Sequence, residues 1–117
     1  MTDKYFEVTA RYTVVFNEGV DFRHATDIMV EARDSIWCNY YEFNSDYQWR
    51  HHSSLVDGCV KVSAELRGCL DYRDESESFA EECGIVDATL SYPSEDGGFA
   101  DSIKEYHFEC QTKEVYY

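Results

Sequence analysis

The stretch that decides the fold is KYFEVTARYTVVFN, residues 4–17, close to the start of the chain. Its side chains alternate along the whole segment, so that one face carries Phe6, Val8, Ala10, Tyr12, Val14 and Phe16. A period of two residues is typical of a strand with one buried face. The pattern therefore predicts a long, half-buried β-strand that ends at the turn signal of residues 17–19.

The period of the apolar residues changes in the next segment, residues 22–37. There they recur at helical spacing, at Ala25, Ile28, Met29, Ala32 and Ile36. This spacing places them on one face of a helix. The sequence thus predicts a long helix over residues 22–37, with Asp21 as its N-cap.

The middle of the chain predicts two further strands. Residues 39–50 are rich in aromatic side chains and predict a strand that runs through a turn at residues 44–46. The polar residues 51–54 are expected to form a loop. Residues 59–67 alternate again, and Gly68 is expected to mark a bulge in that strand.

The last third of the chain mixes both patterns. Residues 74–83 are expected to form a short helix that ends at Gly84, with an acidic loop as the alternative. Residues 85–92 and 103–116 alternate and predict two strands. A loop of turn residues separates them at 93–98.

These elements together favour an α+β fold. In it an antiparallel β-sheet of about four to six strands carries one long and one short helix, packed on one face. The chain has 117 residues, no internal repeat and no linker-like segment. Residues 1–117 are therefore expected to form a single domain.

The charge balance is strongly acidic, with 24 acidic and ten basic residues and a formal net charge of −14. Such a chain repels nucleic acid and anionic membranes, so neither is an expected direct partner. It attracts basic protein surfaces, and the commonest large ones are nucleic-acid-binding sites. General solubility or adaptation to salt is the alternative explanation.

The acids concentrate in the second half of the chain, where residues 71–109 hold twelve acids and two bases. On a helix over residues 74–83, Asp74, Glu77 and Glu81 would lie on one side. A face that binds a basic partner explains this repulsive arrangement, and a solvated acidic helix is the alternative. The acids predicted to bind a partner are Asp71, Asp74, Glu75, Glu77, Glu81, Glu82, Glu95 and Asp96.

Aromatic residues make up 16% of the chain and crowd into residues 40–49. A strand in a two-layer domain buries only one face, so some of these rings should be exposed. Exposed tyrosine beside carboxylates suits Arg and Lys, while coverage of a thin core is the alternative. The aromatic residues predicted to bind a partner are Tyr40, Tyr41, Tyr47 and Trp49.

Motifs of catalysis and of metal binding are missing from the sequence. It has no Gly-rich phosphate loop, no His-Glu-x-x-His motif, no Gly-x-Ser-x-Gly elbow and no EF-hand loop. A zinc site of His51 or His52 with Cys59 and Cys69 lacks the usual Cys-x-x-Cys spacing. We therefore expect a protein that is not an enzyme and that uses no cofactor or metal.

Targeting signals are also missing, because no basic N-terminal region precedes an apolar stretch and no apolar run reaches about 18 residues. The five cysteines are irregularly spaced and odd in number. They are expected to be reduced thiols in a cytoplasm, which would be that of the host cell if the protein is viral.

In its size, acidity, alternating strands and lack of motifs, the chain resembles the small counter-defence proteins of bacterial viruses, namely anti-CRISPR inhibitors and DNA mimics. It also resembles immunity proteins that neutralise nuclease toxins. The likeness is one of character over the whole chain and matches no family motif. It implies stoichiometric inhibition, with the carboxylates of Asp74, Glu77 and Glu81 in the place of phosphates.

Four functional hypotheses follow from the sequence. The first is an inhibitor that occupies the nucleic-acid-binding surface of a defence complex, such as a CRISPR effector. The second is an immunity or antitoxin protein that blocks a basic nuclease toxin. The others are a structural assembly partner and a small enzyme or ligand binder with a tyrosine-lined pocket.

Overall fold

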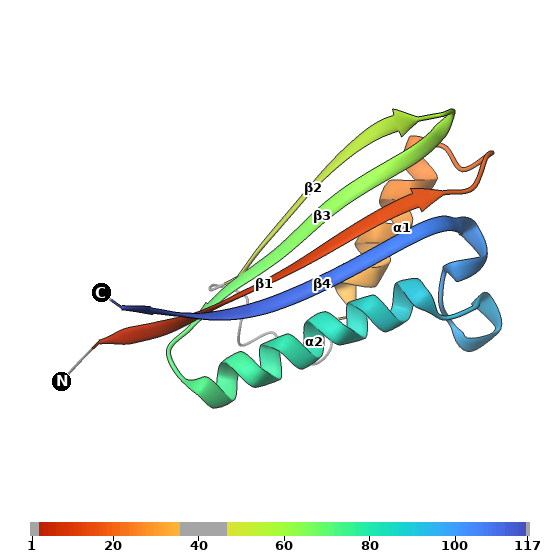
Figure 1. The fold of residues 1–117 in the computed structure, drawn as a ribbon. Helices are drawn as coiled ribbons and strands as arrows, with labels where there is room; N and C mark the ends of the chain where they lie inside the picture. Colours follow the sequence, from red (N-terminus) through yellow and green to blue (C-terminus); the bar gives the residue numbers. More distant parts are fainter. Residues whose placement is uncertain (1–2, 36–46, 117) are drawn as a thin grey trace.

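The computed structural model describes residues 3–35 and 47–116. In chain order the elements are β1 (Lys4–Phe16), α1 (Phe22–Asp34), β2 (Tyr47–Val56), β3 (Cys59–Leu70), α2 (Arg73–Ser91) and β4 (Ile103–Tyr116). Two short 3₁₀ turns, Ser94–Asp96 and Ala100–Ser102, connect α2 to β4. Figure 1 shows α2 running along the length of the strands.

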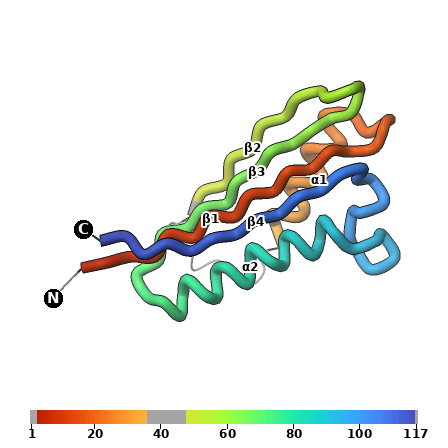
Figure 2. Tube along the Cα trace, in the orientation of Figure 1, coloured from red at the N-terminus to blue at the C-terminus, as the bar shows by residue number. Residues whose placement is uncertain are grey.

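The four strands form one antiparallel sheet in the order β2-β3-β1-β4, with both helices packed on the same face. The βαββαβ order and this strand arrangement are those of a ferredoxin-like fold. The α+β prediction is confirmed. The first and last strands are neighbours, so the two ends of the chain lie side by side (Figure 2).

The core lies between the sheet and the helices and follows the predicted alternation of β1. All six inward side chains of that strand are buried. The ring of Tyr12, at the centre, stacks on Phe108 of β4 with 5.1 Å between ring centroids. Its hydroxyl donates a 2.7 Å hydrogen bond to the carbonyl oxygen of Cys83 in α2. Burial of this phenol raises its pKa.

Helix α1 is confirmed with the predicted cap. The Oδ1 atom of Asp21 accepts a 2.8 Å hydrogen bond from the backbone N–H of His24. The buried face of the helix consists of Ala25, Ile28, Met29 and Ala32, as its spacing predicts. The helix ends at Asp34, and the predicted last turn lies outside the described residues.

Helix α2 overturns two predictions. Residues 74–83 belong to a 19-residue helix that continues through the predicted stop at Gly84 and through the predicted strand 85–92. The reason is a continuous buried face at spacings of three and four residues, formed by Ser76, Phe79, Cys83, Val86 and Leu90. The helix predicted to be short is therefore the longer of the two.

Two smaller predictions about the strands are also wrong. Residues 51–54 belong to β2, where they pair with β3, and form no loop. Gly68 marks no bulge, because it keeps its register opposite Val8. Its missing side chain instead admits the ring of Phe79, since a Cβ atom there would lie 2.8 Å from the Cζ atom of that ring. The predicted strand and turn at 39–46 lie outside the described residues.

Candidate partner-binding surface

The two sides of the protein differ sharply in charge. On the sheet face that the described helices leave uncovered, bases and acids nearly balance. The bases there are Arg11, Arg50, Lys61, Arg67 and Lys113, and the acids are Glu7, Glu65, Glu105 and Glu109. The other 20 of the 24 acids and the other five of the ten bases lie elsewhere in the chain. Among the described residues, most of these other acids lie in the helices and the connecting segments.

The solvent-facing side of α2 carries the predicted acidic stripe. Asp74, Glu77 and Glu81 are exposed and follow one another at helical spacing. None of the three makes an ion pair or a side-chain hydrogen bond with another described residue. Their charges therefore remain available to a partner.

Other predicted acids lie at the two ends of the same helix. Asp71 precedes α2 and is exposed, and Glu75 is partly exposed in its first turn. Glu95 and Asp96 are exposed in the turn that follows the helix. These four carboxylates extend the acidic surface beyond the central stripe in both directions.

Glu82 differs from the other predicted acids because it is buried, and its assignment to the exposed acidic surface is wrong. Its residue is 4% exposed and lies on the buried side of α2. Its Oε2 atom has no hydrogen-bond partner among the described residues. Burial raises the pKa of this carboxyl, and the charge of neighbouring Glu81 raises it further. The side chain therefore cannot be part of an exposed acidic surface.

The aromatic residues singled out in the sequence are only partly placed. Tyr40 and Tyr41 lie outside the described residues, and Tyr47 begins β2. Trp49 is half-buried beside the core, with 6.1 Å between its ring centroid and that of Tyr12. Its Nε1–H group donates a 3.1 Å hydrogen bond to Nδ1 of His51. Most of this ring thus serves packing.

Sequence reasoning missed three exposed apolar side chains that border the acids. Tyr72, just before α2, is 69% exposed, and Tyr92, just after it, is 54% exposed. Ile85 is 38% exposed and continues the stripe of Asp74, Glu77 and Glu81 one turn further. Extending the helical spacing from residue 74 to residue 92 would have found Ile85 and Tyr92. The strand predicted over 85–92 hid that relation.

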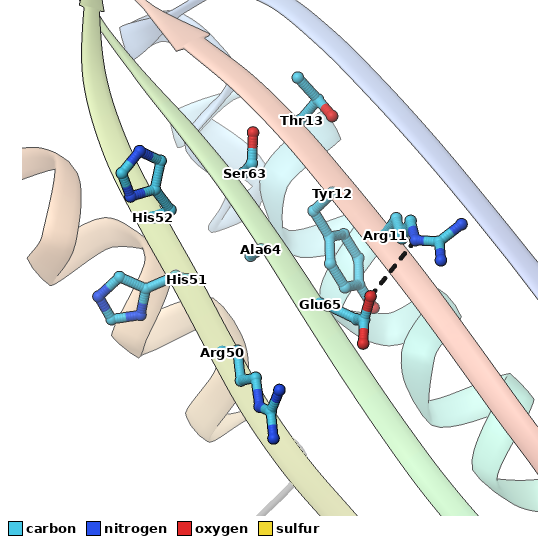
Figure 3. A pocket seen from close by; sticks show the side chains of 9 residues that line it. All are labelled: Arg11, Tyr12, Thr13, Arg50, His51, His52, Ser63, Ala64 and Glu65. Atoms are coloured by element: carbon cyan, nitrogen blue, oxygen red, sulfur yellow. Dashed lines mark hydrogen bonds and ion pairs between the residues drawn. The ribbon is translucent and has the colours of Figure 1, made fainter.

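A shallow depression of about 480 Å³ lies on the uncovered face of the sheet, over β1, β2 and β3. Arg50, Glu65 and Arg11 lie in a row across it (Figure 3), and Arg11 Nε is 3.4 Å from Glu65 Oε2. His51 and His52 alternate along β2 and so point to opposite faces of the sheet. Within residues 3–35 and 47–116, no group of three His, Cys, Asp or Glu side chains is arranged to hold a metal.

One cysteine has an unusual environment. The thiol of Cys83, buried in α2, lowers the pKa of the neighbouring thiol of Cys110 in β4 below its usual value. The same contact, together with burial, raises the pKa of Cys83. Cys110 is exposed, and the lowered pKa favours its reactive thiolate form.

Comparisons with known proteins give a likeness of fold. No protein-family model matches the sequence, and no curated protein matches it. The structure is similar to the de novo designed protein Foldit4, with a TM-score of 0.46, 15% identity, and 93% of this chain and 96% of that chain covered. It is also similar to At3g17210 from Arabidopsis thaliana, with a TM-score of 0.43, 12% identity, and coverages of 89% and 92%. Neither likeness bears on function.

Among the described helices, none is long and apolar enough to cross a membrane.

Proposed function

We propose that the protein is an acidic inhibitor that binds the nucleic-acid-binding surface of a defence complex, with the outer side of α2 in the place of nucleic acid. The observation that carries the proposal is the exposed stripe of Asp74, Glu77 and Glu81, none of which is neutralised by a described base. The nearest base along the helix, Arg73, is paired with Glu114 of β4 at 2.9 Å.

The spacing of these carboxylates suits a groove that binds phosphates. At a rise of about 1.5 Å per residue, the three acids span roughly 10 Å of helix. One DNA strand presents a phosphate about every 3.4 Å of helix axis, so the stripe covers the path of a few phosphates. A carboxylate also accepts the paired hydrogen bonds of an arginine, as a phosphate does.

The stripe has a stability cost that binding would explain. Like charges three or four residues apart each destabilise a helix by about 0.2–0.5 kcal/mol. The positive end of the helix dipole offsets this cost for Asp74 and Glu75, which lie in the first turn. It does not reach Glu81. Exposed Ile85 and Tyr92 then add apolar contact area at the other end of the stripe, where a partner can bury it.

The test is a pull-down from a bacterial lysate that contains defence systems, eluted with a salt gradient and read by mass spectrometry. The variant Asp74→Asn/Glu77→Gln/Glu81→Gln removes three charges from α2. The matched control Glu18→Gln/Asp27→Asn/Glu31→Gln removes three exposed charges from α1 and the turn before it. Both variants change the net charge equally, so they separate the α2 surface from overall acidity.

We expect a nucleic-acid-binding complex that elutes as salt rises and that added DNA or guide RNA displaces. The α2 variant should bind at least about tenfold more weakly, which is roughly 1.4 kcal/mol, and the α1 variant should bind as the wild type does. Equal binding by both variants would refute phosphate mimicry by α2. Recovery of a nuclease toxin in place of a defence complex would assign the protein to the immunity class.

A further inference from the structure

The uncovered face of the sheet carries an alternating row of charges at its centre. Residues that are paired in the register of neighbouring strands form this row, which runs Arg50 (β2), Glu65 (β3), Arg11 (β1) and Glu109 (β4). Arg11 is the shared partner of two acids, at 3.4 Å from Glu65 and 3.6 Å from Glu109. Arg50 donates a 3.3 Å hydrogen bond from its Nη2 atom to Oε1 of Gln48 but has no ion pair among the described residues, so its charge is not neutralised at the β2 end of the row.

This row is complementary to a second copy of itself. In two stacked sheets, a twofold axis can lie midway between the sheets, parallel to the strands and level with the gap between β3 and β1. This axis reverses the strand order of the second copy, so that β2 faces β4 and β3 faces β1. It places Arg50 opposite Glu109 of the second copy and Glu65 opposite Arg11 of the second copy. Every charge in the row then meets an opposite charge. A twofold axis perpendicular to the strands would instead place Arg50 over Arg50, so the charges select one orientation.

The neighbouring rows tolerate the same arrangement. The complete rows on either side of the central one are Gln48–Arg67–Thr9–Gln111, His52–Ser63–Thr13–His107 and Ser54–Lys61–Val15–Glu105. When each of these rows faces the same row of the second copy in reversed order, Lys61 meets Val15, Arg67 meets Thr9, and Glu105 meets Ser54. None of these rows brings together two acids, or two Lys or Arg side chains.

Size and overall charge also fit a second copy of this chain. Four strands of about ten residues cover roughly 19 Å by 33 Å, which is a flat area of about 600 Å². The protruding side chains make the accessible surface of this face larger than its flat area. A standard interface buries about 800 Å² per partner. In a chain with a net charge of −14, this face is the side on which bases slightly outnumber acids, so it can approach a second copy without the repulsion that the helix side would cause.

We propose that the protein forms a homodimer through the uncovered faces of its two sheets, aligned by the row Arg50–Glu65–Arg11–Glu109. Face-to-face sheets lie about 10 Å apart, a gap that an arginine and a glutamate side chain bridge. Aligned sheets cross at about 30°, and this rotation displaces the central row least, because that row lies nearest the point where the two sheets cross. Both α2 helices then lie on the outside, which gives the dimer two identical acidic surfaces.

The test uses two variants that should be monomeric alone and dimeric together. Arg50→Glu sets a new carboxylate opposite Glu109 of its own second copy, and Glu109→Arg sets a new guanidinium opposite Arg50, so each variant repels itself. In a mixture, the carboxylate introduced by Arg50→Glu meets the guanidinium introduced by Glu109→Arg, and the unchanged Glu109 and Arg50 meet each other. Light scattering behind size exclusion measures the mass at submillimolar protein, and circular dichroism checks that both variants are folded.

We expect the wild type at twice 13.7 kDa, each variant alone at 13.7 kDa, and the equimolar mixture at twice that mass again. A wild type that stays at 13.7 kDa would overturn the proposal, as would a folded mixture that remains monomeric. Net charge alone predicts another result, because Glu109→Arg lowers the acidity and should then favour association. The sheet variants leave α2 intact, so their outcome is independent of the proposed inhibitory function.

Discussion

The buried carboxylate of Glu82 leads to a stability prediction whose size follows from its surroundings. Its residue is 4% exposed, and its Oε2 atom has no hydrogen-bond partner among the described residues. An unsatisfied buried polar group costs about 1–3 kcal/mol. Methionine has nearly the same shape without the polar atoms, so Glu82→Met should raise the free energy of unfolding by about that amount at neutral pH. At about 4 °C per kcal/mol for a chain of this length, the Tm should rise by roughly 4–12 °C.

The gain should depend on pH in a defined direction. Burial raises the pKa of Glu82 above its usual value of 4.5 in the folded protein. Ionisation of this group therefore disfavours the folded state, and the loss develops as pH rises from 4.5 through the raised pKa. The stabilisation by Glu82→Met should be largest at neutral pH and should shrink towards pH 4, where the wild-type carboxyl is protonated.

Thermal and urea unfolding, followed by circular dichroism at pH 7 and pH 4, measure this effect. Glu81→Met is the matched control, because the same change at the exposed neighbour should alter stability by no more than about 0.5 kcal/mol. The reasoning fails if Glu82→Met is no more stable than the wild type at pH 7, or if its gain is as large at pH 4. Binding of a partner should be unaffected, since the side chain does not reach the surface.

Three further outcomes can be checked by simple measurements. Gly68→Ala should lower the free energy of unfolding in urea by about 1–3 kcal/mol, because its Cβ would overlap the ring of Phe79. Gly84→Ala should raise it by about 0.5–1 kcal/mol, since this position is helical and a Cβ there meets nothing within 4 Å. Cys110 should be the first of the described thiols alkylated at pH 7, and Cys83→Ala should slow its alkylation by removing the neighbouring thiol that lowers its pKa. Peptide mapping by mass spectrometry reads this last result directly.

The strands that were predicted well from the sequence are those whose two faces differ in polarity. In β1, in β3 and in β4 from Tyr106 to Glu109, more buried and more exposed side chains alternate, and the core and the solvent enforce that pattern. The edge strand β2 was misjudged at residues 51–54, because an edge strand needs little apolar character and its His and Ser side chains look like a loop.

The second half of α2 was misread because its pattern is ambiguous. Val86, Ala88 and Leu90 alternate like a strand, but Val86 and Leu90 also continue the helical spacing from Phe79 and Cys83. Glycine near a possible helix end suggests a stop, yet a stop needs the left-handed conformation. That conformation occurs at the glycines of the described turns and not at Gly84. Tertiary packing decided the outcome.

The candidate surface was predicted in part. The acids of α2 were identified because charge is visible in the sequence, whereas burial is not, and Glu82 was therefore wrongly included. The exposed Ile85 and Tyr92 could be placed beside these acids only once α2 was known to be one continuous helix.

The position of β1 in the sheet has a consequence for how the chain is made. Of the four strands of this sheet, β1 leaves the ribosome first and β4 last, and β1 lies between β3 and β4. Until β4 emerges, the edge of β1 that pairs with β4 has no neighbouring strand, and Val8 is not yet paired with Thr112. Such distant pairing slows folding, and the open strand edge favours aggregation in the meantime. A nascent chain stalled before residue 103 should therefore depend on chaperones, whereas the completed chain should not.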